Sequence, residues 1–108
     1  MNKFTQITLP IVLSASLLTA CGGPEDRAAA YLEKSEDFIA EKNYIKARLE
    51  VQNALQIKEE NPYAWLLMAK IQEKTQDYQG AFGSYGRVLS MDANHVEARV
   101  GRGRILLA

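Results

Sequence analysis

The residue types that most often do chemistry in proteins are scarce in this chain. Its 108 residues include one cysteine, Cys21, and one histidine, His95. A single thiol excludes an internal disulfide and a cysteine metal site, and His95 has no evident second ligand or nucleophile partner. The carboxylates follow helix-surface spacing rather than the pairing of an acid–base site. We therefore expect no enzyme, no metal and no other cofactor, and we expect His95 to lie in a turn or to cap a helix.

The start of the chain has the pattern of an export signal that ends at Cys21. Lys3 precedes an apolar run over residues 7–18, and small residues stand directly before the cysteine. A basic start, an apolar centre and small residues before a cut are typical of a secretory signal peptide. The pattern resembles a bacterial lipoprotein signal, in which the cysteine after the cut is lipidated. The resemblance implies that residues 1–20 are removed and that Cys21 carries fatty acids such as palmitate.

This resemblance also implies where the protein works. A membrane-spanning helix needs about 20 strongly apolar residues, and residues 4–20 are too short and too polar. The expected location is therefore the cell membrane, reached by export and held by lipid on Cys21. In a Gram-negative host, Gly22 after the cysteine implies the outer membrane, facing the periplasm. Residues 21–27 are expected to be a short linker that holds the domain close to the bilayer.

The charges of the chain exclude one class of partner. Thirteen basic residues balance thirteen acidic ones, so there is no electrostatic case for nucleic acid. Acidic residues cluster early, whereas Arg99, Arg102 and Arg104 lie near the C-terminus. The length allows one small domain.

The rest of the chain repeats itself at a fixed interval. Ala47 and Ala81 are small, as expected where two helices cross. Trp65 and Tyr85 are large and suit the gaps between helices. The matched positions include Tyr44 with Tyr78, Ala47 with Ala81, Leu55 with Leu89, and Ala30 with Ala64 and Ala98. A period of about 34 residues, with small and large side chains in fixed places, is typical of the tetratricopeptide (TPR) family, which this chain resembles.

The TPR resemblance implies the fold class. It is all-α, a TPR-type α-solenoid of stacked antiparallel helix hairpins, with two full repeats and the first helix of a third. The domain spans residues 28–108, divided into repeats 28–61, 62–95 and a truncated 96–108. The helices are expected near 27–42, 44–58, 62–75, 78–91 and 95–107.

Local signals mark the starts of these helices. Asn43 and Asp77 precede the second helices of the repeats, as N-caps do. Asn61 before a proline reads as an N-cap followed by a first-turn proline. Asn94 with Glu97 three residues later resembles a capping box.

The helix expected at 78–91 contains Gly80, Gly83 and Gly86. Each glycine costs about 1 kcal/mol relative to alanine in a helix interior. We therefore expect close helix contacts at these positions.

By TPR geometry, the first helix of each repeat lines a concave groove. Its apolar residues would accept a helix or an extended peptide, with charged residues at the rim. The expected groove residues are Leu32, Glu36, Ile39, Tyr63, Leu66, Leu67, Lys70, Val100 and Arg104.

These patterns favour a membrane-anchored scaffold that binds a segment of another envelope protein. The resemblance is closest to lipoproteins of exopolysaccharide and C-terminal-sorting (PEP-CTERM) systems, and implies a role in assembling an export, pilus or polysaccharide apparatus. Two alternatives stay open: a docking module of a longer enzyme, or a structural repeat that self-associates through its uncapped C-terminal face. Because the chain ends mid-repeat on the apolar residues 105–108, we expect a fragment of a longer repeat protein.

Overall fold

The computed structural model describes residues 22–108, and the regular secondary structure of this part of the chain is all helix. It holds no strand, so the all-α prediction is confirmed. The signal segment and Cys21 lie outside the described residues. The helices are α1 (Pro24–Ala40), α2 (Tyr44–Ile57), α3 (Pro62–Lys74), α4 (Tyr78–Met91) and α5 (Val96–Leu107).

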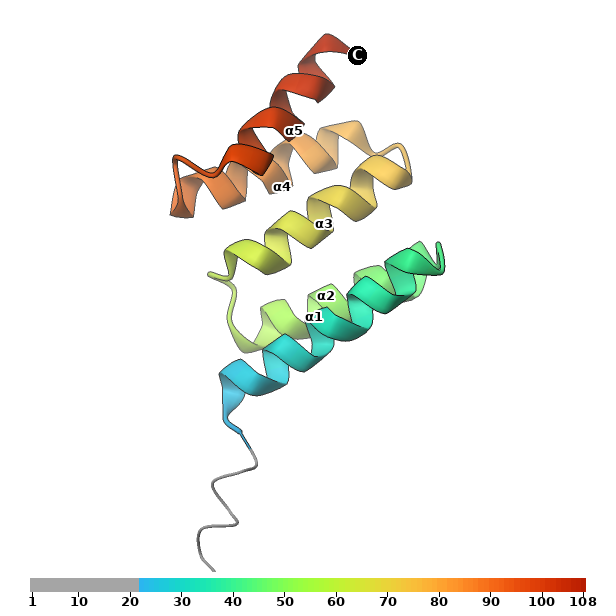
Figure 1. Ribbon diagram of the computed structural model, residues 1–108, viewed down its shortest axis with the longest axis vertical. Coiled ribbons are helices and arrows are strands. Elements are labelled where there is room, and N and C mark those ends of the chain that lie inside the picture. The colour runs from blue at the N-terminus through green and yellow to red at the C-terminus, as the bar shows by residue number, and fades with distance from the viewer. Residues whose placement is uncertain (1–21) are drawn as a thin grey trace, which may run out of the picture.

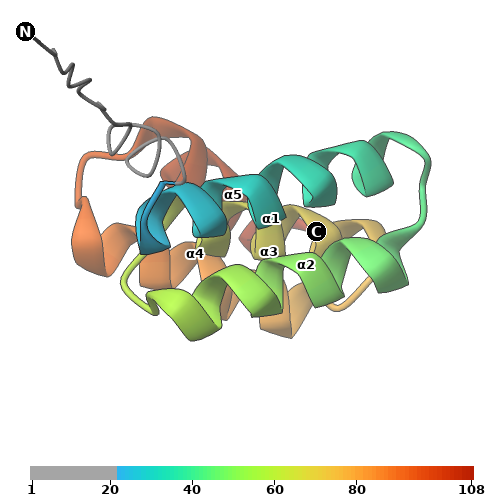
Figure 2. The ribbon, with the colours of Figure 1, turned by 90° about the horizontal axis from the view of Figure 1, so that it is seen from below.

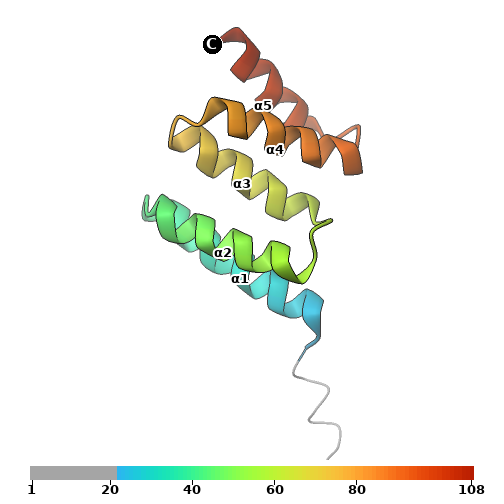
Figure 3. The same ribbon diagram turned by 180° about the vertical axis from the view of Figure 1, so that it is seen from behind.

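The five described helices stack in chain order in two layers. Helices α1, α3 and α5 form one face, and α2 and α4 form the other (Figures 1 and 3). Seen along the stack, the two layers lie one above the other (Figure 2). The most extensive contacts join α1 to α2 and α3 to α4, and smaller ones join α2 to α3 and α4 to α5. This packing is consistent with an α-solenoid.

The helix boundaries follow the period of the sequence. Helix α2 begins at Tyr44, and α4 begins one period later at Tyr78. Helix α3 begins at Pro62, and α5 begins one period later at Val96. The repeated residues therefore occupy repeated places in the fold.

The two hairpin turns also share one backbone conformation. Lys42 has a φ of 62° and Gln76 a φ of 67°, the left-handed region in which helices commonly end. The amide after each of these residues donates to a carbonyl five positions back, Asn43 to Phe38 and Asp77 to Gln72, both at 2.8 Å. Both turns therefore reverse the chain in the same way, so that α2 runs back along α1 and α4 runs back along α3.

Three of the predicted caps are confirmed. The side-chain oxygens of Asn43, Asn61 and Asp77 each accept a hydrogen bond from the backbone N–H three residues later, at 3.2, 3.1 and 2.9 Å. Each bond satisfies an N–H that the helix leaves without a partner. The sequence was therefore sufficient to place the starts of α2, α3 and α4.

The predicted capping box at Asn94 and Glu97 is wrong. The N-cap of α5 is His95, whose Nδ1 accepts from the backbone N–H of Ala98 at 3.2 Å. The side chain of Asp92 accepts from the N–H of Asn94 at 3.1 Å, which uses Asn94 in the preceding turn and shifts the helix start by one residue. His95 is thus a capping residue, as its isolation in the sequence predicted.

Helix α1 begins earlier than expected. It starts at Pro24, so most of the predicted linker, including Glu25 and Asp26, is helical. Proline suits the first helical position because its missing N–H would have no partner there. The two carboxylates in the first turn also interact favourably with the positive end of the helix dipole.

Two hydrophobic cores lie along the stack, and α3 takes part in both. The first core joins α1, α2 and α3, and the second joins α3, α4 and α5. Leu67 and Ile71 of α3 belong to the first core, whereas Leu66 and Ala69 belong to the second. The first core contains Ala28, Leu32, Ala47, Val51, Ala54, Ala64, Leu67, Met68 and Ile71, and the second contains Leu66, Ala69, Ala81, Tyr85, Val88 and Ala98.

The glycines of α4 have different reasons to be there. A Cβ atom at Gly80 would overlap the side chains of Asp77 and Gln72, whereas Cβ atoms at Gly83 and Gly86 would meet nothing within 4 Å. The predicted close contact is therefore right for Gly80 and wrong for the other two.

Candidate functional site

The groove that the sequence predicts corresponds to a hollow on the face formed by α1, α3 and α5. This hollow has a volume of about 720 Å³. It lies against the C-terminal ends of α1 and α3 and along α5. Its lining consists of Ile39, Lys70, Glu73, Lys74, Tyr78, Tyr85, Glu97, Val100, Arg104, Ile105 and Ala108.

The structure brings four of the predicted groove residues together in this hollow. They are Ile39 from α1, Lys70 from α3, and Val100 and Arg104 from α5. They come from three helices that are far apart in the sequence, so only the stack brings them side by side. Their role in binding stays a prediction.

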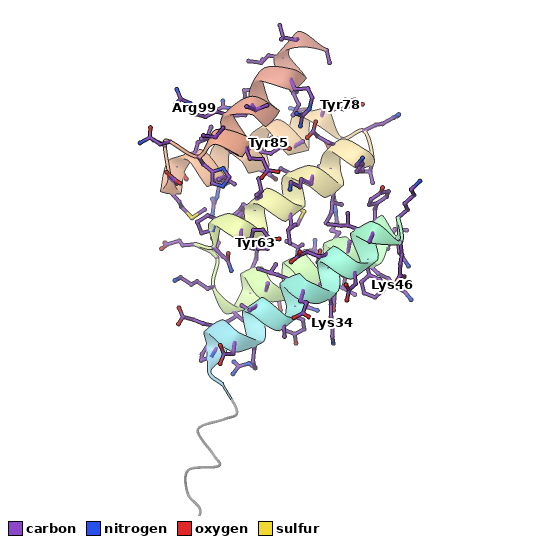
Figure 4. All side chains as sticks on the ribbon, viewed as in Figure 1. Lys34, Lys46, Tyr63, Tyr78, Tyr85 and Arg99 are labelled. Atoms are coloured by element: carbon purple, nitrogen blue, oxygen red, sulfur yellow. The ribbon has the colours of Figure 1, made fainter. Side chains whose placement is uncertain are left out.

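Two further predicted residues, Glu36 and Tyr63, lie next to each other between α1 and α3. Partial burial, and then a hydrogen bond to the neighbouring Glu36 carboxylate, raise the pKa of Tyr63. Figure 4 labels Tyr63 on the side of α3 that faces α1. This pair extends the polar face from the hollow toward the start of α3.

The remaining three, Leu32, Leu66 and Leu67, do not line the groove. Their exposed fractions are 5%, 4% and 3%, and all three belong to the hydrophobic cores. The physical reason is that each first helix is covered by its own second helix, and α3 is also covered by the preceding pair. These leucines stabilise the stack and cannot contact a ligand without unfolding it.

A network of charged and polar groups crosses the hollow. Arg104 of α5 donates two hydrogen bonds to Glu73 of α3, from Nη2 to Oε1 at 2.7 Å and from Nε to Oε2 at 3.1 Å. The hydroxyl of Tyr85 on α4 also donates to Oε1 of Glu73. A carboxylate held by a two-pronged guanidinium contact has a fixed orientation, so three helices are locked together at this point.

The network shifts the titration of its members. The hydrogen bonds from Arg104 and Tyr85 lower the pKa of Glu73, although burial opposes them. Burial, followed by the hydrogen bond to Glu73, raises the pKa of Tyr85. The hydrogen bond to Glu73 also raises the pKa of Arg104. All three changes favour an anionic Glu73, a cationic Arg104 and a neutral Tyr85 at neutral pH.

A second ion pair lies beside this network. Lys70 Nζ of α3 is 2.6 Å from Glu97 Oε2 of α5. Both side chains are about half exposed, so the pair contributes little to stability. It does place one more cation and one more anion at the rim of the hollow.

Sequence analysis did not predict the close contact between Gly101 and Tyr85 that lets Tyr85 reach Glu73. Gly101 of α5 is buried, and a Cβ atom there would overlap the Tyr85 ring. The equivalent pair one repeat earlier is Val51 and Leu67, both buried in the first core. In the earlier pair, the larger side chain is Leu67 of α3, and Val51 of α2 is the smaller one. In the later pair, the larger side chain is Tyr85 of α4, and Gly101 of α5 leaves room for it. That exchange, at positions one period apart, is the signal that reveals the contact.

Residues 22–108 contain neither a membrane-spanning helix nor a cluster of metal ligands. None of the five helices is long and apolar enough to cross a membrane. Within the same residues, no three His, Cys, Asp or Glu side chains are placed to hold a metal ion.

No protein-family profile matches this chain, and no curated protein sequence matches it.

Proposed function

We propose that this chain is a TPR-type interaction scaffold whose groove binds a segment of a partner protein. The observation that carries the proposal is the hollow lined by residues of α1, α3, α4 and α5, together with helix starts that recur with the period of the sequence. Repeat proteins of stacked helices use such concave faces for binding.

The lining indicates a ligand with both apolar and charged groups. Ile39 and Val100 offer aliphatic surface, and the half-exposed Tyr78 offers an aromatic ring. Lys74 lies exposed at the edge of the hollow. A short helix or an extended segment that carries apolar side chains and at least one carboxylate would complement this surface.

The network in the wall of the hollow supports binding rather than catalysis. Arg104 holds the Glu73 carboxylate and Lys70 pairs with Glu97. The hydrogen bonds from Arg104 lower the pKa of Glu73, so this carboxylate is a poor general base near neutral pH. The same contacts hold the wall of the groove in one geometry, which reduces the entropy lost on binding. We therefore do not propose an enzyme, although a docking module of a longer enzyme is a second arrangement that this groove would serve.

We place the scaffold in the bacterial cell envelope, anchored by lipid on Cys21. The export pattern of residues 1–20 and the position of the only cysteine support this placement. In a Gram-negative host, Gly22 favours the outer membrane. The envelope apparatus would be one for export, pilus assembly or polysaccharide secretion. Incorporation of labelled palmitate tests the anchor, and we expect Cys21→Ser to abolish both labelling and membrane fractionation.

Site-specific photocrosslinking in the host tests the groove. A photoreactive phenylalanine analogue placed at Tyr78 or Lys74 should crosslink to the same partner, identified by mass spectrometry. The matched control is Leu49 on α2, which is exposed and does not line the hollow. Both Tyr78 and Leu49 are accessible, so unequal crosslinking reports position rather than exposure. Crosslinking of the same partner at Leu49 and not at Tyr78 would contradict the proposal.

A charge reversal sharpens the test. Lys74→Glu should weaken capture of that partner, whereas Lys34→Glu, on the exposed outer side of α1, should leave it unchanged. Both substitutions are at exposed helix positions and should change the free energy of unfolding by less than about 0.5 kcal/mol. A partner that depends on Lys34 instead would bind the other end of the stack.

A further inference from the structure

Helix α2 exposes two large apolar side chains. Ile45 is 86% exposed and Leu49 is 55% exposed, and residues four positions apart are neighbours on a helix surface. Gln52 and Gln56 continue the same line and are also exposed. We call these four positions the outer line of α2. By the 3.6-residue period of a helix, they lie opposite the buried side of α2, which is formed by Ala47, Val51 and Ala54.

The exposure of this line does not depend on where the chain starts or stops. The outer line of α4, one period later, consists of Gln79, Gly83, Gly86 and Ser90. Gly86 is partly buried and the other three are exposed. The line on α4 is uncovered although α2 precedes it in the stack, and the line on α2 is uncovered although α4 follows it. A neighbouring repeat on either side therefore leaves this surface free.

The two outer lines carry no charge. None of their eight positions holds Asp, Glu, Lys or Arg, although these make up 24% of the chain, and the solvated face of a helix usually carries charged residues. Beside the lines, Arg48 pairs with Asp77 at 4.0 Å. Arg87 pairs with Glu59 at 3.7 Å. A partner that covers the two lines therefore buries no charge that belongs to them.

The two lines also have complementary shapes. Leu49 projects from α2, whereas its equivalent on α4 is Gly83, where a Cβ atom would meet nothing within 4 Å. The same holds for Gly86, the equivalent of Gln52. Each glycine costs about 1 kcal/mol relative to alanine in a helix interior, and no contact inside the chain requires either one. Close approach of another chain is a reason for glycine at such positions.

We propose that two copies of this chain pair through the outer lines, with α2 of each copy packed on α4 of the other. Helices α2 and α4 run in the same direction (Figure 3). A two-fold axis parallel to both helices therefore sets each position of α2 against its equivalent on α4 of the second copy. Leu49 then meets Gly83, and Gln52 meets Gly86, twice in the pair. Such a contact is self-complementary and closes after two copies.

The pairing is independent of the groove. No residue of either outer line contributes to the hollow, so both grooves stay open in the pair, whatever they bind. Each copy contributes two lines of four positions, fewer than the ~20–30 residues per side of a standard stable interface. We therefore expect a dissociation constant in the micromolar range or weaker.

Analytical ultracentrifugation of the chain from Gly22, which holds both cores, tests the pairing. Gly83→Lys fills the space that Leu49 of the second copy needs, and should weaken dimerisation about tenfold or more. Gly103→Lys on α5 is the matched control, because a Cβ atom at either glycine meets nothing in the single chain. Both variants gain a good helix former and should melt no earlier than the parent chain, so loss of the dimer in Gly83→Lys cannot come from unfolding.

Three outcomes of this experiment would overturn the proposal. The first is a chain that stays monomeric to about 1 mM, well above the dissociation constant expected from an interface of this size. The second is a dimer that Gly83→Lys leaves unchanged. The third is a dimer that Gly103→Lys weakens as much as Gly83→Lys does.

Disulfide trapping tests which helices meet. The chain from Gly22 has no cysteine, so Leu49→Cys and Gly83→Cys variants each carry one thiol and can be mixed and oxidised gently. The proposed pair predicts that the mixed disulfide between the two variants forms fastest. Faster formation of the symmetric Leu49→Cys disulfide would indicate that α2 packs on α2, which contradicts the proposal. Higher oligomers that grow with concentration would indicate an open contact and would equally contradict the closed pair.

The pairing can be distinguished from binding in the groove. A photoreactive residue at Leu49 should yield a product with the mass of two chains, whereas one at Tyr78 should yield the mass of the chain and its partner. Loss of one product without the other shows which of the two proposals has failed.

Discussion

The contact between α2 and α3 and the contact between α4 and α5 occupy equivalent places in the stack, but different side chains fill them. Where α2 meets α3, Val51 and Leu67 are both buried in the first core. Where α4 meets α5, the equivalent residues are Tyr85 and Gly101, and the tyrosine ring takes the space that a side chain at Gly101 would need. We call these pairs the first and the second junction. At the first junction both residues contribute side-chain volume, whereas at the second junction Tyr85 contributes all of it.

The difference has a consequence beyond packing. Val51 ends in methyl groups and contributes only to the core, whereas Tyr85 carries a hydroxyl through the core to the groove, where it donates to Glu73. The second junction thus connects the core to the candidate binding surface through Arg104 and Glu73. The first junction has no equivalent polar path among the described residues.

The largest effect is expected from placing a leucine at Gly101. Gly101→Leu recreates the residue of the first junction without making room for it, so the Tyr85 ring must move. Overpacking of this kind costs about 3 kcal/mol or more of unfolding free energy. Urea denaturation followed by circular dichroism measures it.

A second substitution tests whether excess side-chain volume is what destabilises the Gly101→Leu variant. Tyr85→Val combined with Gly101→Leu reproduces the first junction, and should recover much of the loss that Gly101→Leu causes alone. A double variant no more stable than Gly101→Leu would show that the two junctions are not interchangeable.

Removing only the hydroxyl of Tyr85 should have a smaller effect. Tyr85→Phe keeps the ring against Gly101 but removes the hydrogen bond to Glu73, a loss of about 1.5 kcal/mol for a bond to a charged group. Tyr78→Phe is the control, since its side chain is half exposed, and should change stability by less than about 0.5 kcal/mol. Equal effects of the two substitutions would mean that the bond to Glu73 contributes nothing to the second junction.

The pH dependence of stability should depend on Glu73. Its pKa is lowered in the folded protein, so its contribution is complete above the ordinary value of 4.5 and is lost as the pH falls through the lower, folded value. Unfolding measured at a series of pH values should therefore show a loss of stability in this acidic range. Glu73→Gln should flatten that part of the curve, and an unchanged slope would be inconsistent with the network.

The smallest effect, and the only stabilising one, is expected two positions from the second junction. Gly103→Ala adds a methyl group where nothing lies within 4 Å and removes a helix-interior glycine, a gain of about 1 kcal/mol. Thermal melting should show a higher midpoint for Gly103→Ala and a lower one for Gly101→Ala. The same sign for both would mean that Tyr85 does not occupy the space at Gly101.

Most of the helix boundaries could be predicted because their signals are local. The caps Asn43, Asn61 and Asp77 each act within three positions, and the period of the sequence repeats them. The error at Asn94 arose where two adjacent polar residues, Asn94 and His95, both suit the start of a helix. Only the preceding turn decides between them.

The groove was harder to predict because its residues are selected by neighbours distant in the sequence. Leu66 and Leu67 are adjacent and both apolar, yet they face different cores, and neither faces the groove. The period of the sequence predicts that α3 has an apolar face. It does not predict that other helices cover α3 on two sides. Of the four predicted residues that do meet in the hollow, Lys70 and Arg104 carry a charge that keeps them out of both cores.

The double role of α3 also determines how the molecule comes apart. A helix that supplies side chains to both cores cannot melt with one of them and remain ordered in the other, so α1 to α4 should unfold in a single cooperative step. Helix α5 rests mainly on α4, and its last turn carries the exposed Leu106 and Leu107. Hydrogen exchange should therefore release the amides of α5 first, as fraying at one end, while those of α3 exchange only with global unfolding.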